Sequence, residues 1–312
     1  MTEKKINGSK IARKIRKVLA AELATMKDWG ISLHLVAVEL GRNPAAEMYA
    51  RYQRKACEKI GIHYTLQRLP EDTSEAVLIA EIHRLNADPG VTGIMVQLPL
   101  PGIDRRKVQA AISPHKDVEG INPINLGLLV YGEPNLAPCT AMGVLELIHA
   151  TGLDLDGKEA VIVGRSEIVG KPIGLLMLKK MAVTIVGSKL TRDLPFYTSR
   201  ADVLVVAAGK PGLITGDMVK PGAIVIDVGI NVIEVTAENG KRDLDQNGNP
   251  KTRVVGDVNY DEVAQVAGFI TPVPGGVGPI TVTMLLKNVV EAAKIGLSAN
   301  KLPLSTLMSW AK

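Results

Sequence analysis

Aromatic residues are scarce in this chain, at 3% of its 312 residues. Proteins that bind single-stranded nucleic acid stack bases on aromatic side chains, so this composition argues against that class. No stretch reaches the roughly 18 apolar residues that a membrane-spanning helix requires. The first residues are polar, which predicts no secretory signal peptide. We therefore expect a cytoplasmic protein that binds neither membranes nor nucleic acid.

Cysteine is nearly absent, and Cys57 and Cys139 lie too far apart to suggest a disulfide framework or a zinc motif. The histidines are scattered without a paired spacing, so no metal site is expected. Residues 243–248 resemble the opening of a calcium-binding loop. Val254 stands where such a loop needs a bidentate glutamate, however, and a hairpin turn is the preferred interpretation.

The formal net charge of +5 comes from the first thirty residues, which hold eight Lys/Arg and three Asp/Glu. Four of these cations recur at helical spacing, opposite a stripe of apolar residues: Lys10, Arg13, Lys14 and Lys17. The pattern predicts the solvated face of one amphipathic helix. A stripe that contacts nucleic acid is the alternative.

The first half of the chain alternates between strand and helix patterns, which predicts an α/β domain with ligands at the carboxyl ends of its strands. Ser9 is the expected N-cap of the first helix. Residues 113–132 are polar and rich in turn residues, and we expect a long loop there. The remaining expected elements are helices over 9–27, 45–60 and 74–85 and strands over 33–40, 65–69 and 91–98.

The second half is organised around residues 157–189. An apolar strand over 160–163 ends at Gly164, Arg165 and Ser166, and a helix starts near Gly170. A buried strand that runs through glycine into a helix presents backbone N–H groups to a pyrophosphate. The spacing is not the dinucleotide motif G-x-G-x-x-G, so this turn alone is a weak signal.

The end of the next strand favours NADP over NAD. An NAD site usually has a carboxylate there for the ribose 2′-hydroxyl, whereas this chain has Gly187, Ser188 and Lys189. A hydroxyl and a cation, together with Arg165 on the glycine turn, suit a 2′-phosphate. We therefore predict NADP as the cofactor.

Several long motifs in order resemble the methylenetetrahydrofolate dehydrogenase/cyclohydrolase family. They are residues 96–101, 116–120, 164–172, 227–231 and 271–279. The resemblance implies two α/β domains with a cleft between them, the second a Rossmann-like doubly wound parallel sheet, and a homodimer. It also implies oxidation of 5,10-methylene-tetrahydrofolate to the methenyl form, followed in most members by hydrolysis to 10-formyl-tetrahydrofolate.

The resemblance assigns residues 1–141 with 284–312 to a folate-binding catalytic domain and 142–283 to an NADP-binding domain. It implies catalytic roles at Tyr49, Gln53, Gln97 and Glu119. Its cofactor positions are Gly164, Arg165, Ser166, Ser188 and Ile230. Its substrate positions are Tyr49, Gln97, Leu98, Pro99, Glu119, Pro274, Gly275 and Gly276.

The chain departs from the family at its catalytic lysine, one helical turn after Tyr49, where it has Gln53. Hydride loss is driven by a nitrogen lone pair of the folate and mainly needs positioning, whereas hydrolysis needs proton transfer. Gln53 forms hydrogen bonds but does not titrate. We therefore predict that the dehydrogenase activity survives and that the hydrolysis is weak or lost. Lys55 lies about 120° around the helix from Tyr49 and is not expected to substitute.

Other interpretations remain open at this point. Gln53 is an exposed helix residue if the alignment is shifted, and Tyr49 is then a packed tyrosine. A second alternative is a catalytically silent relative of the family that binds folate or nucleotide. A third alternative is an NADP dehydrogenase of a different small substrate, because Glu119 and Ala141 replace family residues.

Overall fold

The computed structural model describes residues 4–187, 191–235, 243 and 248–299. The chain divides into two compact units. The first unit consists of Arg13–Cys139 with Thr281–Lys312, and the second of Met1–Ala12 with Thr140–Ile280. Both are α/β, which confirms the predicted fold class.

The first unit contains a three-stranded parallel sheet in the order β2-β1-β3. Helix α1 enters it from the second unit and α10 returns to it. Its elements are α1 (Gly8–Asp28), β1 (His34–Leu40), α2 (Pro44–Glu58), β2 (His63–Leu69), α3 (Glu75–Ala87), β3 (Gly93–Val96), α4 (Arg105–Ala111), α5 (Pro123–Tyr131) and α10 (Val277–Ala299).

The second unit contains a five-stranded parallel sheet in the order β10-β7-β6-β4-β5. Its elements are α6 (Cys139–His149), β4 (Glu159–Val163), α7 (Gly170–Met177), β5 (Ala182–Val186), α8 (Leu194–Thr198), β6 (Val203–Val206), the 3₁₀ turn η1 (Gly216–Met218), β7 (Ile224–Asp227), β8 (Asn231–Glu234), β9 (Thr252–Val255), α9 (Tyr260–Val266) and β10 (Phe269–Ile270). Residues Lys5 and Ile6 extend the sheet by pairing with Ile270.

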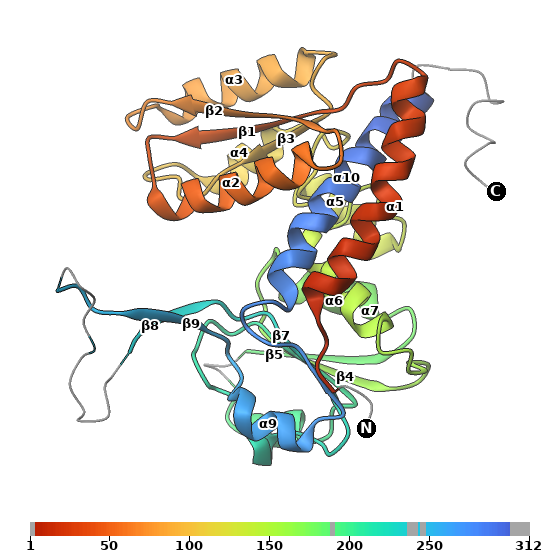
Figure 1. Ribbon diagram of the computed structural model, residues 1–312, viewed down its shortest axis with the longest axis vertical. Helices are drawn as coiled ribbons and strands as arrows, with labels where there is room; N and C mark the ends of the chain where they lie inside the picture. The colour runs from red at the N-terminus through yellow and green to blue at the C-terminus, as the bar shows by residue number, and fades with distance from the viewer. Residues whose placement is uncertain (1–3, 188–190, 236–242, 244–247, 300–312) are drawn as a thin grey trace. The chain divides into compact units, whose positions relative to one another are not determined.

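Alternation along β1 separates the two faces of the first sheet. Val36, Val38 and Leu40 pack on α3 and α4 in one apolar core. The opposite face is covered by α2 (Figure 1). This second face is the polar one, because it carries the side chains of Tyr64 and Gln97, which bond to α2.

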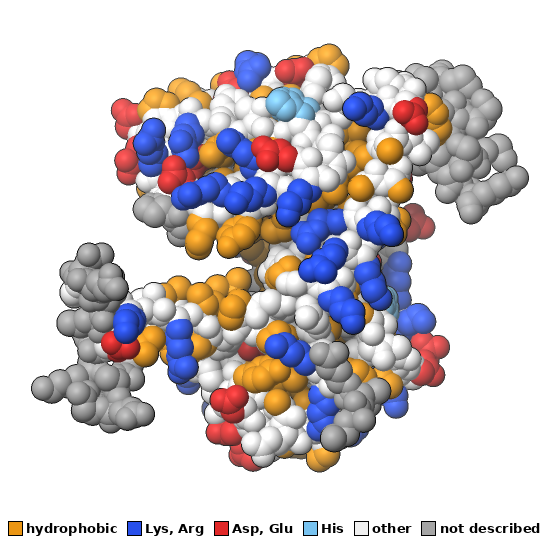
Figure 2. Space-filling view, viewed as in Figure 1, with side chains coloured by type: hydrophobic (Ala, Val, Ile, Leu, Met, Phe, Trp, Pro, Cys, Tyr) orange, Lys and Arg blue, Asp and Glu red, His pale blue; other side chains and the backbone are white. Residues whose placement is uncertain are grey.

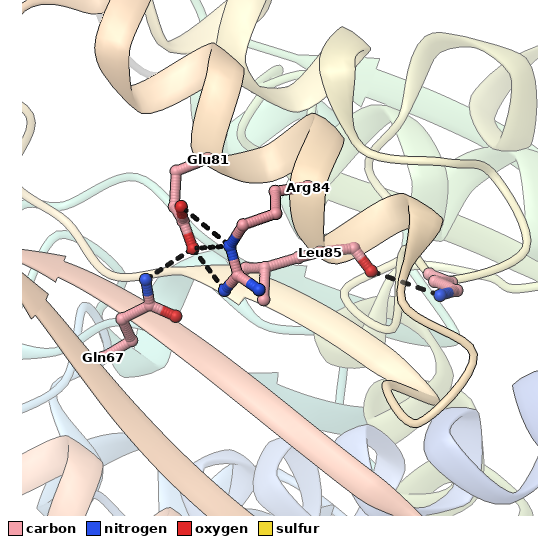
Figure 3. A network of polar contacts seen from close by, with 5 residues as sticks. Gln67, Glu81, Arg84 and Leu85 are labelled. Carbon is pink, nitrogen blue, oxygen red and sulfur yellow. Dashed lines mark hydrogen bonds and ion pairs between the residues drawn. The ribbon is translucent and has the colours of Figure 1, made fainter.

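Helix α3 contacts the sheet through side-chain hydrogen bonds as well as through apolar packing. Gln67 on β2 donates to Glu81 over 2.6 Å, and the Arg84 guanidinium donates to the same carboxylate (Figure 3). At the end of the helix, Lys116 Nζ donates to the carbonyl oxygens of Leu85 and Asp88. The two Lys116 bonds hold the loop that carries residues 116–120 against the end of α3.

Helix α1 has the predicted amphipathic form. Lys10, Arg13, Lys14 and Lys17 are exposed, whereas Leu19 and Leu23 are buried. Figure 2 shows Lys and Arg side chains along this helix. The predicted cap at Ser9 is wrong, because the helix begins at Gly8 and the Asn7 side chain accepts the Lys10 N–H over 2.9 Å.

The expected loop over residues 113–132 is also wrong in its second part, where α5 forms. Asn122 caps this helix, Pro123 occupies its first turn, and Gly132 ends it at φ 81°. Most of the predicted hairpin turn over 243–248 lies outside the described residues, and the strands that flank it in sequence, β8 and β9, pair antiparallel. No helix among the described residues is long and apolar enough to cross a membrane.

Candidate functional site

Helix α2 places Gln53 inside the first unit. From position 47 onward, where the burial of this helix is described, the buried residues are Ala50, Gln53, Ala56 and Cys57, which share one face at helical spacing. Gln53 is 0% exposed, so the alternative of a surface residue is excluded. Lys55 lies on the exposed face of α2. Tyr49 is 40% exposed, one turn before Gln53.

Gln53 lies at the centre of a hydrogen-bonded cluster. Its Oε1 accepts from Gln97 Nε2 over 2.7 Å and from the Tyr64 hydroxyl over 3.2 Å. Its Nε2 is buried and has no hydrogen-bond partner among the residues that the structure describes. Two predicted site residues, Gln53 and Gln97, are therefore brought into contact, whereas Tyr64 was not predicted.

Burial raises the pKa of the Tyr49 hydroxyl, and the nearby Glu119 and Cys139 raise it further; interaction with the Gln53 side chain opposes this shift. Tyr49 therefore stays protonated at neutral pH. The predicted catalytic residues Tyr49, Gln53, Gln97 and Glu119 consequently all belong to one region of the first unit.

The loop after β3 continues from Gln97 into Leu98 and Pro99. Gln97 is 5% exposed and Leu98 is 48% exposed. The Leu98–Pro99 peptide bond is cis. Leu98 therefore presents an apolar side chain to solvent directly beside the buried Gln97 amide.

The loop over 116–120 is anchored by Asp117, which is 0% exposed. Its Oδ2 accepts from the Asn122 backbone N–H and from Asn125 Nδ2. Burial raises the pKa of Asp117. Burial and the charge of Asp117 together raise the pKa of Glu119 to about 8. Glu119 thus titrates near physiological pH, unlike an ordinary glutamate.

The cofactor-type turn of the second unit lies at the switch point of its sheet. The chain leaves β4 for β5 on one side and continues to β6 on the other, and ligands bind at the carboxyl ends of strands beside such a point. Gly164 follows β4 at φ 146°, and a Cβ there would overlap the Ala207 carbonyl oxygen. A Cβ at Gly170 would overlap the Gly164 carbonyl oxygen. The two glycines allow this turn to pack closely and leave its backbone open to a phosphate.

Arg165 extends from this turn to the end of β5. Its Cδ and Nε would lie 3.3 and 3.4 Å from a Cβ at Gly187. Ser166 accepts the Gly170 N–H at 3.4 Å, and Ile230, between β7 and β8, is 71% exposed. Ser188 lies outside the described residues, so its predicted contact is not described.

A buried aspartate that the sequence pattern did not reveal holds the neighbouring loop. Asp257 is 0% exposed and accepts from the backbone N–H groups of Ala208, Gly209 and Lys210 and from Asn231 Nδ2. Its own N–H donates to Asp227 Oδ1. Asp257 therefore shapes residues 208–210, directly after β6.

The other predicted substrate residues, Pro274, Gly275 and Gly276, belong to the second unit, in the loop between β10 and α10. Gly275 has φ 105°, and a Cβ at Gly276 would lie 2.6 Å from the Pro272 carbonyl oxygen. Glycine is therefore required at both positions. Over the part of the chain that is described, no group of three His, Cys, Asp or Glu side chains is placed to hold a metal ion.

Comparison with known proteins identifies the family to which this chain is similar. Residues 6–119 match the catalytic domain of tetrahydrofolate dehydrogenase/cyclohydrolase, and residues 138–297 match its NAD(P)-binding domain. The bifunctional protein FolD of Polaromonas naphthalenivorans is 46% identical over 297 residues, 95% of this chain and 100% of that protein.

Solved structures agree with this match. The bifunctional enzyme FolD from Campylobacter jejuni is 41% identical with a TM-score of 0.85, covering 94% of this chain and 99% of that one. The Trypanosoma brucei enzyme, solved with NADP and an inhibitor, is 36% identical with a TM-score of 0.85, covering 94% and 98%. The predicted family and nicotinamide cofactor are confirmed. The chain therefore belongs to the tetrahydrofolate dehydrogenase/cyclohydrolase family of enzymes, and its residues 138–297 are an NAD(P)-binding domain.

Proposed function

We propose that this enzyme oxidises 5,10-methylene-tetrahydrofolate to the methenyl form with NADP and hydrolyses the methenyl form weakly or not at all. The observation that carries the proposal is the buried Gln53, held by Gln97 and Tyr64. The resemblance gives this position to the family's lysine. Folate binding is assigned to residues 1–141 with 284–312, and NADP binding to residues 142–283.

The oxidation needs little proton transfer from the protein. A nitrogen lone pair of the folate drives loss of the hydride and stabilises the cation that forms. The protein's task is to position the pterin, through Tyr49, Gln97 and the Glu119 carboxylate, and to exclude competing reactions. None of these tasks requires an amine at position 53.

The hydrolysis is different because a proton must leave the attacking water and another must reach a ring nitrogen. Such acid–base catalysis contributes about 10²–10⁴-fold. An amide at position 53 does not titrate. Tyr49 stays protonated because burial raises its pKa, and Lys55 lies on the exposed face of α2. None of these three side chains therefore supplies the proton transfer that the family's lysine would perform.

The residues of the second unit fit a phosphorylated dinucleotide. The backbone around Gly164 and Gly170 leaves the space that a Cβ would fill, and Arg165 lies alongside Gly187 with no carboxylate at that point. We propose that Ser166 and Ser188 assist Arg165 and that Ile230 packs on the nicotinamide. When bound, NADP supplies the hydride acceptor.

Replacing Arg165 by alanine is expected to lower kcat/KM for NADP by roughly 10–100-fold while changing that for NAD much less. The reason is loss of a charge-assisted hydrogen bond to the 2′-phosphate. Initial rates with each cofactor measure the ratio. Arg200→Ala is the control, because Arg200 pairs with Glu159 at the opening of β4. An unchanged NADP preference in Arg165→Ala would contradict the assignment.

Glu119 is expected to make folate use depend on pH. Its pKa is raised to about 8, and the ionised carboxylate is the form that accepts pterin N–H groups. kcat/KM for the folate should therefore rise as pH increases through about 8. A folded-state pKa above the unfolded value also means that this group's contribution to stability declines as pH rises between 4.5 and about 8.

The pH profile of Glu119→Gln tests this assignment. The variant should bind folate more weakly and lose the rise near pH 8, while Glu71→Gln, at an exposed position, should keep it. A rise that persists in Glu119→Gln would assign the titration to another group.

A second candidate is a bifunctional enzyme in which Glu119 takes over proton transfer. The raised pKa of about 8 favours it, because a group that titrates near the working pH is an effective acid or base. In that case Glu119→Gln would abolish hydrolysis of the methenyl substrate. If the first proposal is correct, the unsubstituted protein already hydrolyses the methenyl substrate little, and Glu119→Gln should change that rate little.

The experiment that tests the proposal is a steady-state assay of the purified full-length protein with methylene-tetrahydrofolate and each nicotinamide cofactor. We expect NADPH formation at rates well above those of NADH formation. No reduction of either cofactor would leave the silent relative or a different substrate as the explanation.

We also propose that the enzyme is a homodimer in the cytoplasm, as the family implies. Light scattering coupled to gel filtration should give twice the mass of one chain. A single-chain mass at micromolar concentration would overturn the dimer.

A further inference from the structure

The Gln53 side chain is oriented by donors on one side only. Its Oε1 receives Gln97 Nε2 at 2.7 Å and the Tyr64 hydroxyl at 3.2 Å, which uses both lone pairs of this oxygen. With Gln97 donating as it does here, turning the Gln53 amide by 180° would set its Nε2 against the NH₂ group of the Gln97 amide. In this arrangement, the Gln97 amide therefore defines which way the Gln53 amide points.

The nitrogen of the Gln53 amide lacks a hydrogen bond in the described structure. Gln53 is 0% exposed, and its Nε2 has no hydrogen-bond partner within the described part of the chain. A buried donor without a partner costs about 1–3 kcal/mol, and such groups in native structures are explained by a bound water or ion, by strain or by a catalytic role. The Gln53 side chain also lowers the pKa of the half-exposed Tyr49, as a hydrogen-bond donor close to that hydroxyl does, so the amide faces the family's substrate tyrosine.

Tyr64 is built to remain a donor. It is 8% exposed on β2, and the Arg54 guanidinium lies 5.7 Å from the centre of its ring. Burial raises its pKa, so the phenol keeps its proton at any working pH. The titratable and charged groups around Tyr64 and Gln53 are Tyr49, Arg54 and Cys57 from α2, Glu39 from β1 with its partner Arg68, and Glu119 and Cys139.

We propose that Tyr64 is a positioning residue, which together with Gln97 holds the Gln53 amide so that its free Nε2 donates a hydrogen bond to the bound folate. Gln53 is then a neutral donor in the place of an ammonium. The inference rests on the proposed function, because it takes the folate to lie beside Tyr49 and Gln53. It adds a residue, Tyr64, that neither the family motifs nor the sequence pattern indicated.

The sharpest test is Gln53→Glu in the full-length protein. The carboxylate keeps acceptors for Gln97 and Tyr64 but has no donor, whereas the protonated carboxyl regains one. At about pH 8 we expect kcat/KM for the folate roughly 10–100-fold below that of the unsubstituted protein. The ratio of variant to unsubstituted kcat/KM should then rise as pH falls. Gln265→Glu, at an exposed position on α9, is the matched control and should show a flat ratio.

Tyr64 is tested in that background. In the Gln53→Glu protein, the Tyr64 hydroxyl stabilises the ionised carboxyl, so adding Tyr64→Phe should raise that carboxyl's pKa and move the rise to higher pH by about one unit. Tyr64→Phe alone should raise KM about 2–10-fold with kcat little changed. Tyr131→Phe, at an 86% exposed position, should change neither. A lowered melting temperature with unchanged KM and an unmoved pH profile would mean that Tyr64 only packs.

Calorimetric binding of tetrahydrofolate to the same variants separates this inference from the proposed function. If the unsubstituted protein binds tetrahydrofolate but does not reduce NADP, the proposed function fails and the pH dependence of binding still decides the role of Tyr64. A flat ratio for Gln53→Glu between about pH 6 and 9 would overturn the inference while leaving the dehydrogenase intact. Absence of tetrahydrofolate binding would overturn both.

Discussion

Replacing Gln53 by lysine is expected to increase hydrolysis of methenyl-tetrahydrofolate by about 10²–10⁴-fold, the usual contribution of acid–base catalysis. The side chain at this position is 0% exposed and lies against Gln97 and Tyr64. Burial lowers the pKa of a lysine amine, which brings it closer to the working pH. The dehydrogenase rate should change by less than about tenfold, because hydride loss depends on positioning.

The measurement follows methenyl-tetrahydrofolate consumption without cofactor, corrected for the uncatalysed reaction. Glu58→Lys adds the same amine at an exposed position of α2 and should leave hydrolysis unchanged. If Gln53→Lys folds and oxidises methylene-tetrahydrofolate but gains no hydrolysis, the missing lysine is not what limits this reaction.

Changing Asp257 to asparagine is expected to destabilise the second unit by roughly 2–6 kcal/mol and to abolish measurable NADP binding. Two backbone N–H groups, of Ala208 and Gly209, converge on its Oδ2. An amide nitrogen at either oxygen position would face donors and leave part-buried N–H groups unpaired, at up to about 1–3 kcal/mol each. Residues 208–210 follow β6 at the switch point of the sheet, so their displacement should reach the cofactor.

Thermal unfolding and cofactor titration by calorimetry test this prediction together. Asp261→Asn, at an exposed position on α9, is the control and should leave both unchanged. An Asp257→Asn protein with full NADP affinity would show that loop 208–210 holds its shape without the carboxylate.

The parallel sheets could be predicted because their strands are short apolar runs separated by helical patterns. Strand β4 is buried along its last four residues, and β6 and β7 are buried throughout, as strands covered on both faces should be. The glycine turn after β4 was recognisable for the same reason, since a strand, a glycine and a helix follow directly in sequence. Local pattern was therefore sufficient for the scaffold of the cofactor site.

Helix α5 was missed although its signals are local. Asn122, Pro123 and Gly132 are a cap, a first-turn proline and a left-handed terminator at the right spacing. The surrounding polar residues and turn formers obscured them. The short helices α4 and α8 were missed for a similar reason, although Asp104 and Asp193 cap them.

The contacts that orient the site depend on long-range pairing. Tyr64 bonds to Gln53 because β2 pairs with β1 and α2 packs on this face of the sheet. The residues next to Tyr64 in the sequence do not indicate that partner. Asp257 collects donors from residues 208–231, which are distant in sequence. Gln53 was identified as a departure from a motif, but its burial and its free Nε2 emerge only from the packing of α2 on the sheet.

The most direct test of the central claim compares two rates of one preparation of the unsubstituted protein: NADP reduction with methylene-tetrahydrofolate, and hydrolysis of methenyl-tetrahydrofolate. We predict a clear dehydrogenase rate and a hydrolysis rate close to the uncatalysed background, because Gln53 cannot move a proton. A hydrolysis rate comparable with the dehydrogenase rate would contradict the account.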